Sequence, residues 1–411
     1  MPPAWHARSM NQRKTLAAGA LAVVATFAAE RAAFAGPCSA LPNPLVIESG
    51  DTQEPLLKGL GRQLRDSTTA PTTVLYFLAG SCTLIDDMYN ARKLTVNLSY
   101  VPSTAEDPTW TTAKPSLTCT MDVAGGLPVD IAISATFVSS CTQASPPAGL
   151  GIIKGPIQSY AFIVPKASTQ QVITAEEGYF TFGFGNGGQV NPWSDELFMF
   201  IRPATKSTIL TLAAAVGVPA AKWKGQRKNA STEVLNGVAT STNPDKTIGI
   251  IGSEVYDANR GEVTELAFRA YGQRHGFLPD SSVASFDKRN LRDGHYTPWA
   301  PTVYITAVDG TNTPTSARAK TFIDLVLGNP TPTVTDVDGL GTVIAKGLVP
   351  DCAMKVKRDF EGGDLSLYTP AQPCGCFYES KVPQGTSSCT ACTDDGPCGA
   401  GKCRHGLCEA Q

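Results

Sequence analysis

The sequence predicts an α/β fold with a mostly parallel sheet, followed by a small disulfide-rich C-terminal tail. Between about residues 45 and 350, short apolar segments alternate with segments of helical apolar spacing, and this alternation favours helices packed on a parallel sheet. The cysteines give the second observation, because none lies between Cys141 and Cys352 and eight lie from Cys352 to Cys408. The end of the chain therefore differs in character from the rest.

The first strand and the first helix are predicted at residues 44–50 and 54–64. Residues 44–50 form an apolar run that ends at a glycine, and Pro55 suits the first turn of the helix. Four leucines share one face of this helix: Leu56, Leu57, Leu60 and Leu64. The same patterns predict, in order, a strand at 72–81, a helix at 83–94, a strand at 128–137, a β-rich segment at 155–166, a helix at 231–241, a strand at 247–257, a β-rich segment at 296–308 and a helix at 314–328 with the buried residues Phe322, Ile323, Val326 and Leu327.

Residues 200–208, FIRPATKST, join an apolar strand to a helix predicted at 209–217, where Gly217 suits the C-terminal stop. Arg202 and Lys206 would lie near the positive end of this helix dipole, where cations are disfavoured. A bound anion would relieve that contact, because a helix N-terminus offers unpaired N–H donors and the arginine fork fits an oxyanion. In the alternative interpretation, both cations form surface ion pairs, with Asp86, Asp87 or Asp195.

The first 35 residues have the features of a secretory signal peptide. Arg8, Arg13 and Lys14 form a basic region, residues 16–29 are apolar, and an A-x-A cleavage signal ends at Ala35. We expect cleavage after Ala35 and a periplasmic or secreted protein. The alternative is an uncleaved N-terminal anchor.

The twelve cysteines agree with this location, since an oxidising compartment permits disulfides. The tail, residues 373–411, has no apolar periodicity and needs covalent links to fold. Its spacing leaves the disulfide pairing open, and a zinc site that includes His405 is the alternative to disulfides. We expect the tail to be separable from the rest, provided that Cys352 does not pair with it.

The near balance of 34 basic and 36 acidic residues, a net charge of −2, argues against a nucleic-acid-binding protein. No G-x-S-x-G, H-E-x-x-H or paired-carboxylate signature is present, so we expect no catalytic residue and no enzyme activity. No cofactor and no metal site are predicted, and we expect a monomer.

A series of short motifs resembles a known family. In chain order they are ESGDTQEPLL, LAGS, VDIAISA, VNPWSD, RPATKST, TIGI and HYTPWAPTVYI. This series, between about residues 43 and 350, is similar to that of the periplasmic phosphate-binding proteins of ABC transporters, which have the type 2 periplasmic-binding fold.

The resemblance implies two α/β lobes that clamp a ligand between them. The implied domains are a signal peptide at 1–35, the first part of lobe I at 36–157, lobe II at 158–297, the returning part of lobe I at 298–372, and the tail at 373–411.

The resemblance also implies a set of ligand-binding positions. Arg202, Thr208, Thr52 and Ser81 fall on binding residues of the family, whereas Lys206 and Ser207 replace its Ser and Gly, and Gln53 replaces its Phe. The family's binding Asp, which accepts the proton of hydrogen phosphate, aligns with Ala135. Asp51 could supply an acceptor from another direction, or it could repel the ligand.

These implications lead to two functional hypotheses. The first is an extracytoplasmic solute-binding protein that delivers phosphate, or a similar oxyanion, to an ABC permease. The second is a non-transport secreted or surface binding protein on the same fold, in which the tail binds a partner.

Overall fold

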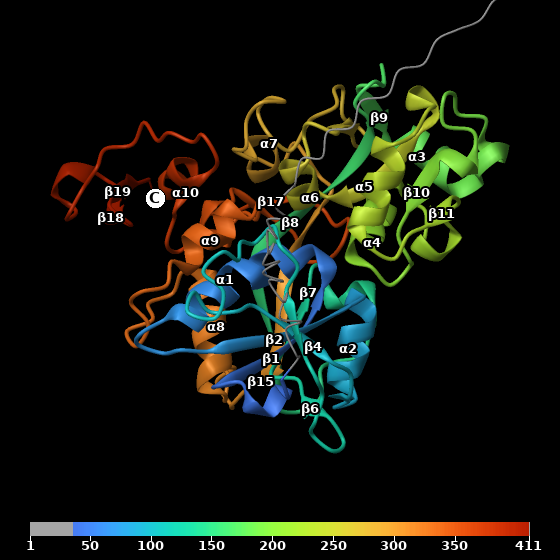
Figure 1. Cartoon of the computed structure of the whole chain (residues 1–411). Helices are drawn as coiled ribbons and strands as arrows, with labels where there is room; N and C mark the ends of the chain where they lie inside the picture. Colours follow the sequence, from blue (N-terminus) through green and yellow to red (C-terminus); the bar gives the residue numbers. More distant parts are fainter. Residues whose placement is uncertain (1–35, 411) are drawn as a thin grey trace, which may run out of the picture. The chain divides into compact units, whose positions relative to one another are not determined.

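A computed structural model describes residues 36–410 (Figure 1). The predicted signal peptide and the bond after Ala35 lie outside the described residues. One 11-stranded sheet has the strand order β11-β10-β12-β8-β15-β7-β1-β2-β4-β5, with β13 paired to β8. Its strands are β1 (Pro44–Gly50), β2 (Thr73–Ala79), β4 (Leu98–Tyr100), β5 (Leu117–Cys119), β7 (Ile131–Ser134), β8 (Leu150–Pro165), β10 (Met199–Ile201), β11 (Gln226–Arg227), β12 (Ile248–Gly252), β13 (Val263–Glu265) and β15 (Trp299–Ala307).

The helices pack on this sheet or follow it in the chain. They are α1 (Glu54–Asp66), α2 (Ser81–Tyr89), α3 (Ala175–Phe184), α4 (Ser207–Val216), α5 (Ser231–Ala239), α6 (Ser253–Ala258), α7 (Arg289–Arg292), α8 (Ala317–Leu327), α9 (Gly339–Ala345) and α10 (Gly375–Lys381). Four small two-stranded pairs complete the structure: β3 (Lys93–Leu94) with β6 (Leu127–Pro128), β9 (Val172–Thr174) with β14 (Ala267–Arg269), β16 (Val356–Lys357) with β17 (Ser366–Leu367), and β18 (Lys402–Arg404) with β19 (Leu407–Glu409). Within residues 36–410, no helix is long and apolar enough to cross a membrane.

The β1 half of the sheet consists of β7, β1, β2, β4 and β5, and helices cover both of its faces (Figure 1). β1 pairs in parallel with β2 and β7. Because successive strand side chains point to opposite faces, Ile47 packs in the core formed with α1 and α8, and Val46 lies in a cluster on the other side. α2 covers that other side, where Leu84 and Ile85 pack with Ala132.

The β12 half consists of β11, β10 and β12, and it is covered in the same way. α4 lies on one face and packs with Phe162 and Ile250, whereas α5 and α6 lie on the other face and pack with Ile163 and Ile251. The predicted helix at 209–217 is confirmed: Gly217 ends α4 with φ 75°, a conformation that favours glycine. The predicted apolar face of α4 is buried: Ile209, Leu212, Ala213 and Val216.

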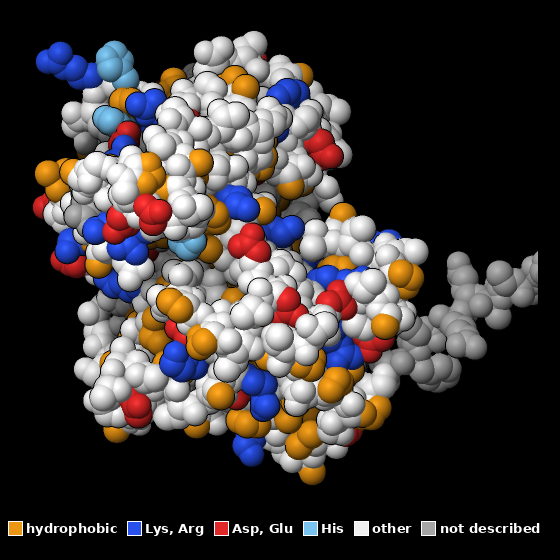
Figure 2. All heavy atoms as spheres, turned by 90° about the vertical axis from the view of Figure 1, so that its left-hand side faces the viewer, with side chains coloured by type: hydrophobic (Ala, Val, Ile, Leu, Met, Phe, Trp, Pro, Cys, Tyr) orange, Lys and Arg blue, Asp and Glu red, His pale blue; other side chains and the backbone are white. Residues whose placement is uncertain are grey.

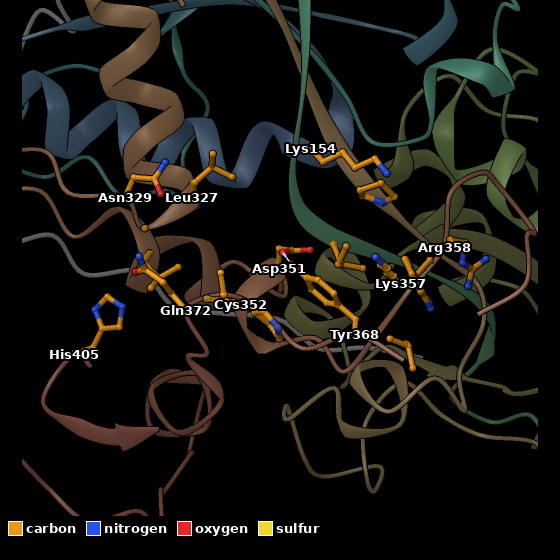
Figure 3. Close-up of a pocket in the computed structure, with 18 residues that line it drawn as sticks. Lys154, Leu327, Asn329, Asp351, Cys352, Lys357, Arg358, Tyr368, Gln372 and His405 are labelled. Atoms are coloured by element: carbon orange, nitrogen blue, oxygen red, sulfur yellow. Dashed lines mark hydrogen bonds between the residues drawn. The ribbon is translucent and has the colours of Figure 1, made fainter. Parts of the chain in front are cut away.

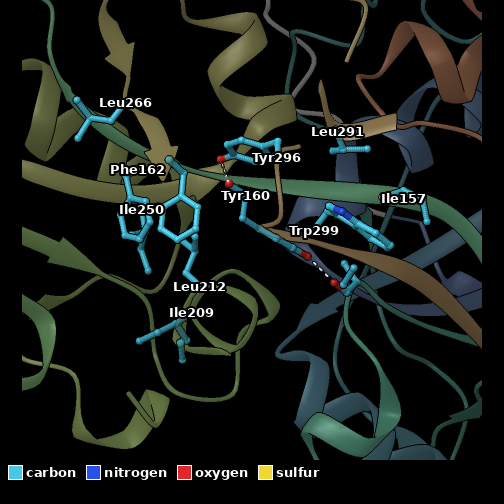
Figure 4. Packing of buried hydrophobic residues seen from close by; sticks show 14 of the residues in the cluster. Ile157, Tyr160, Phe162, Ile209, Leu212, Ile250, Leu266, Leu291, Tyr296 and Trp299 are labelled. Carbon is cyan, nitrogen blue, oxygen red and sulfur yellow. Dashed lines mark hydrogen bonds between the residues drawn. The ribbon is translucent and has the colours of Figure 1, made fainter. Parts of the chain in front are cut away.

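The long strands β8 and β15 connect the two halves and run antiparallel to each other. The first part of β8 pairs with β15, and the last part pairs with β12. Figure 4 shows the buried side chains at this connection, where Tyr296 donates a hydrogen bond to the carbonyl of Tyr160, and Tyr160 donates one to the carbonyl of Ala135. The cluster around Tyr160 therefore extends from the β12 half to Ala135, just after β7, whereas the helices on the β1 half pack in clusters of their own.

The sheet is mixed, which corrects the expectation of a mostly parallel one. Parallel pairs join β1 to β2 and β7, and β10 to β11 and β12, whereas the pairs made by β8 and β15 and the edge pairs β2–β4 and β4–β5 are antiparallel. The alternating patterns predicted the local strand and helix pairs correctly. They could not predict the direction of β8 and β15, because that direction depends on long-range strand pairing. The segment at 247–257 was also predicted wrongly as one strand, because β12 ends at Gly252 and α6 follows. In α8, Leu325 is buried and Leu327 is only half-buried.

All twelve cysteines lie among the described residues, and none of them is free. The pairs are Cys38–Cys119, Cys82–Cys141, Cys352–Cys374, Cys376–Cys389, Cys392–Cys403 and Cys398–Cys408. The zinc alternative for the tail fails, because these sulfurs are not thiolates.

The condition set for a separable tail is not met, since Cys352 pairs with Cys374. In addition, Phe377 and Tyr378 of α10 belong to the main core cluster. The domain boundaries themselves, including the start of the tail at residue 373, stay a prediction.

Candidate functional site

Several turns that follow strands of the two halves meet at one place. β1 and β2 are each followed almost directly by a helix, and β10 leads to α4 through residues 202–206. The carboxyl ends of parallel strands in an open α/β sheet are the usual position of a ligand site. The backbone N–H of Cys82 donates to the carbonyl of Thr205 at 3.2 Å, and Lys206 Nζ donates to the carbonyl of Ala79 at 2.9 Å. Gly80 permits this contact, because a Cβ there would lie 2.7 Å from the Thr205 hydroxyl.

Arg202 lies in the centre of this region with a side chain that is 0% exposed. Its Nη2 is 2.6 Å from Asp51 Oδ2, and its Nη1 donates to the carbonyl of Lys228 at 3.3 Å. Nε of Arg202 has no hydrogen-bond partner among the described residues. Both Nη atoms of the guanidinium therefore have partners, whereas Nε keeps an unused donor.

Asp51 is the carboxylate that balances both cations. Oδ2 also accepts hydrogen bonds from the backbone N–H and the hydroxyl of Ser231, and Oδ1 lies 3.4 Å from Lys206 Nζ. Burial opposes ionisation of Asp51, but the charges of Arg202 and Lys206 and the Ser231 hydrogen bonds outweigh it and hold the pKa of Asp51 below its ordinary value. The side chain of Asp51 remains 17% exposed, so the network is not fully closed to solvent.

Three hydroxyl groups near this network are buried and have no partner among residues 36–410: those of Thr52, Ser81 and Thr208. A Cβ on Gly50 would lie 3.8 Å from both the Thr52 and the Ser81 hydroxyl oxygen, so these two groups flank the end of β1. Thr208 lies in the first turn of α4, directly after Ser207, which is also buried. Buried polar groups normally have partners, so three exceptions in one region require an explanation.

Gln53 begins a buried hydrogen-bonded chain. Its Nε2 donates to Gln158 Oε1 at 3.0 Å, and Gln158 Nε2 donates to Glu254 Oε2 at 2.5 Å. Burial raises the pKa of Glu254 to about 8, so this group is mostly a neutral acid at pH 7. The amide N–H₂ of Gln53 is thus already hydrogen-bonded to Gln158, unlike the hydroxyls of Thr52, Ser81 and Thr208.

Ala135 provides no acceptor side chain, but a carboxyl group from a distant segment lies near it. The hydroxyl of Thr136 donates to Glu361 Oε2 at 2.5 Å. Burial raises the pKa of Glu361 to about 7. Residue 361 lies far beyond the motif that ends at Ala135, so the sequence pattern could not place it there.

The structure thus brings the predicted residues Asp51, Thr52, Ser81, Arg202 and Lys206 together, with Ser207 and Thr208 at the start of α4. The alternative interpretation, surface ion pairs of Arg202 and Lys206 with Asp86, Asp87 or Asp195, is wrong, since the partner of both cations is Asp51. Asp86 and Asp87 pair instead with Arg92, and Asp195 accepts from the backbone N–H of Leu197. Three residues were missed: Ser231, Glu254 and Glu361.

Comparison with known proteins supports the fold. The sequence matches no protein-family model and no curated protein. Among solved structures, a protein from Clostridium perfringens assigned as a phosphate ABC transporter substrate-binding protein, with bound phosphate, aligns with a TM-score of 0.51 at 14% identity, covering 75% of this chain and 99% of that one.

Two further structures align less well. An ABC-type phosphate transport receptor from Vibrio cholerae has a TM-score of 0.48 at 13% identity, covering 75% of this chain and 100% of that one. The reduced OxyR regulatory domain from Pseudomonas aeruginosa has a TM-score of 0.37 at 10% identity, covering 67% of this chain and 93% of that one. At such identities the likeness concerns the fold alone, and the chain has a mixed α/β fold that matches periplasmic-binding proteins.

Proposed function

We propose that the protein is an extracytoplasmic binding protein for a small oxyanion, with phosphate as the first candidate. The observation that supports this proposal is the group of buried donors without acceptors, namely the hydroxyls of Thr52, Ser81 and Thr208 and Nε of Arg202. Leaving a buried donor unpaired costs about 1–3 kcal/mol. An oxyanion would supply acceptors to all four donors at once.

Asp51 would determine which oxyanion binds. Its carboxylate already pairs with Arg202, so it lowers the net positive charge that a ligand would meet. Oδ1 of Asp51 lies 3.4 Å from Lys206 Nζ, and it can accept a further hydrogen bond, donated by a protonated oxygen of a ligand. Hydrogen phosphate has such a proton, whereas sulfate at neutral pH has none, so Asp51 would take the role that Ala135 cannot fill.

The transport role is the finer part of the proposal. The six disulfides indicate an oxidising location outside the cytoplasm, and the fold is that of non-enzymatic binding proteins. Delivery of the ligand to an ABC permease is the first candidate, and a non-transport secreted or surface binding protein is the second. Permease and ATPase genes beside the gene for this chain would favour transport.

Calorimetric titration of the mature protein with phosphate tests the binding site. We expect phosphate to bind and Arg202→Ala to weaken binding roughly ten- to a hundredfold, because a charge-assisted hydrogen bond contributes about 1.5–3 kcal/mol. Arg92→Ala is the matched control, since that arginine pairs with Asp86 and Asp87 at an exposed position. Equal affinities in all three proteins would reject Arg202 as a ligand contact.

Titration with sulfate tests the proposed role of Asp51. We expect wild type to prefer phosphate and Asp51→Asn to reduce that preference. The substitution replaces a charged acceptor for the phosphate proton by a weaker neutral one, and it adds an N–H donor that suits sulfate. An unchanged ratio of the two affinities in Asp51→Asn would show that Asp51 only neutralises Arg202.

A further inference from the structure

A hollow with a volume of about 520 Å³ shares no residue with the group formed by Asp51, Thr52, Ser81, Arg202, Lys206 and Thr208, here called the Arg202 cluster. It lies between the long strands β8 and β15, the end of α8, and the segment from residue 351 to residue 372 (Figure 3). His405 of the tail also lines it. Neither the predicted ligand-binding residues nor the oxyanion proposal involves this hollow.

One end of the hollow is cationic. Figure 3 shows Lys154, Lys357 and Arg358 at that end, with Leu327 and Asn329 at the other end. Within residues 36–410, no carboxylate lies within ion-pair distance of any of these three cations, although eighteen contacts of that kind are present elsewhere. The positive charges are therefore without a direct counterion.

Two donors in the lining are buried and unpaired. Arg358 is 6% exposed and lies 4.0 Å above the ring of Trp299, which is 2% exposed. Nε of Arg358 and the indole N–H of Trp299 have no hydrogen-bond partner within the described part of the chain. Burial lowers the pKa of Arg358 to about 10, and the charge of Glu361 opposes this effect only in part.

The acidic groups nearby are few. Asp351 lines the hollow, and its carboxylate accepts a hydrogen bond from Tyr368. Glu361 acts on Arg358 from outside the lining and has a pKa raised to about 7 by burial. The rest of the wall is largely apolar, with Ile157, Leu327, Leu340, Val356 and Pro301 among its residues.

We propose that this hollow binds a small organic anion, with its acidic group at Lys154, Lys357 and Arg358 and its apolar body against Trp299 and the aliphatic wall. Ligand sites are commonly concave and mostly apolar, with a few polar groups that fix orientation. The charge requirement comes from the unpaired cations, and the apolar requirement comes from the wall. Figure 2 shows basic and acidic side chains intermingled on the face that bears the tail, so a general positive field on that face does not account for the cationic end.

The test uses the fluorescent anion 1-anilinonaphthalene-8-sulfonate, which combines an apolar body with one negative charge. We expect saturable binding at one site, and a loss of at least tenfold in affinity in the double variant Lys154→Gln/Lys357→Gln. Both lysines are exposed, so the variant should fold. Lys355→Gln is the matched control, because that lysine belongs to the same segment, pairs with Asp293 and does not line the hollow.

Two further measurements identify the site. The uncharged dye Nile red should bind the double variant and wild type equally, since it does not need the lysines. Bound sulfonate dye should quench Trp299, so part of the quenching should disappear in Trp299→Phe. Unchanged dye affinity in the double variant, an equal loss in Lys355→Gln, or no dye binding to wild type would overturn the proposal.

Discussion

At the residue scale, the central feature is that the carboxylate of Asp51 contacts both Arg202 and Lys206. Both cations lie near the N-terminus of α4, where the helix dipole disfavours positive charge. Lys206 is the N-cap residue of α4 and has no side-chain hydrogen bond to the helix, and Arg202 lies just before it. Asp51 comes from the other half of the sheet, 151 residues away from Arg202 in sequence. The helix dipole argument therefore predicted correctly that a negative group is needed. The alternative interpretation expected the chain itself to provide one, but from Asp86, Asp87 or Asp195 and not from Asp51.

Substitution of an unpaired hydroxyl can distinguish an effect on ligand affinity from an effect on the stability of the fold. In Thr208→Val the shape is kept, while a buried donor without a partner is removed. We expect unchanged or slightly higher stability of the ligand-free protein, together with a roughly ten- to hundredfold loss of phosphate affinity. Thermal unfolding and calorimetry measure the two quantities.

Thr136→Val is the control for this substitution, because the Thr136 hydroxyl bonds Glu361 and its loss should destabilise the protein. A Thr208→Val protein that binds phosphate as well as wild type would remove Thr208 from the site.

The buried acid Glu254 predicts a pH dependence of stability. Burial raises the pKa of Glu254 from 4.5 to about 8 in the folded protein. The folded state therefore binds more protons than the unfolded state between these two values, so this contribution to stability is complete below about pH 4.5 and is lost as the pH rises through about 8. Glu48 and Glu361, whose pKa values are raised to about 7, act in the same direction.

Melting temperatures of wild type and Glu254→Gln between pH 5 and 8 measure this effect. We expect the fall in stability with rising pH to be shallower in the variant, because a neutral amide replaces the titrating group. Parallel pH profiles for the two proteins would show that Glu254 does not titrate in this range.

At the scale of elements, local patterns were sufficient where the helix or strand depends on its own residues. The helix at 209–217 needed only its apolar face and Gly217, and the strand at 44–50 is β1 with the same bounds. The prediction for residues 247–257 was wrong because α6 has only six residues, and so short a helix cannot be distinguished from a continuing strand by periodicity alone. The helix predicted at 83–94 ends at Tyr89 as part of α2.

The candidate site was predictable only in part for a related reason. Arg202 and Thr208 are adjacent to a recognisable strand-to-helix turn, whereas Ser231, Glu254 and Glu361 reach the region through tertiary packing. Glu361 belongs to a segment of turns and short strands beyond α9, where no periodicity exists. Contacts of this kind require the strand order of the sheet, which the sequence alone does not provide.

Because α10 packs in the main core, we expect the effect of truncating the tail to depend on whether α10 is kept. Truncation after Pro373, with Cys352→Ser, removes Tyr378 and Phe377 from the core, and we expect a marked loss of stability because losing a buried aromatic side chain costs about 3–5 kcal/mol. Truncation after Cys389 keeps the Cys352–Cys374 and Cys376–Cys389 bonds and α10.

Truncation after Cys389 does remove some contacts of α10. The carboxylate of Glu409 accepts from the backbone N–H groups of Cys376 and Phe377, and the ring of His405 packs against Phe377. We therefore expect it to be destabilised modestly and to remain folded. Circular dichroism during heating compares the two proteins, and equal melting temperatures would contradict the distinct role of α10.

At the scale of the whole molecule, the two halves of the sheet meet through β8 and β15 and through the contacts of Arg202 and Lys206 with the β1 half. The Arg202 cluster and the hollow beside Lys357 lie in different parts of this connection and have different chemistry. The first has hydroxyl donors and a paired arginine, suited to a small oxyanion, and the second has an apolar wall with unpaired cations.

The most direct test of the central claim is to locate a bound oxyanion in crystals. Arsenate is a close analogue of phosphate, and its anomalous scattering marks its position without reference to the protein density. The account predicts one strong arsenic peak at a position where the arsenate oxygens can accept hydrogen bonds from Thr52, Ser81 and Thr208, and a much weaker peak in Arg202→Ala at the same arsenate concentration. An arsenic peak elsewhere in the protein, or none at arsenate concentrations well above those needed for specific binding, would contradict it.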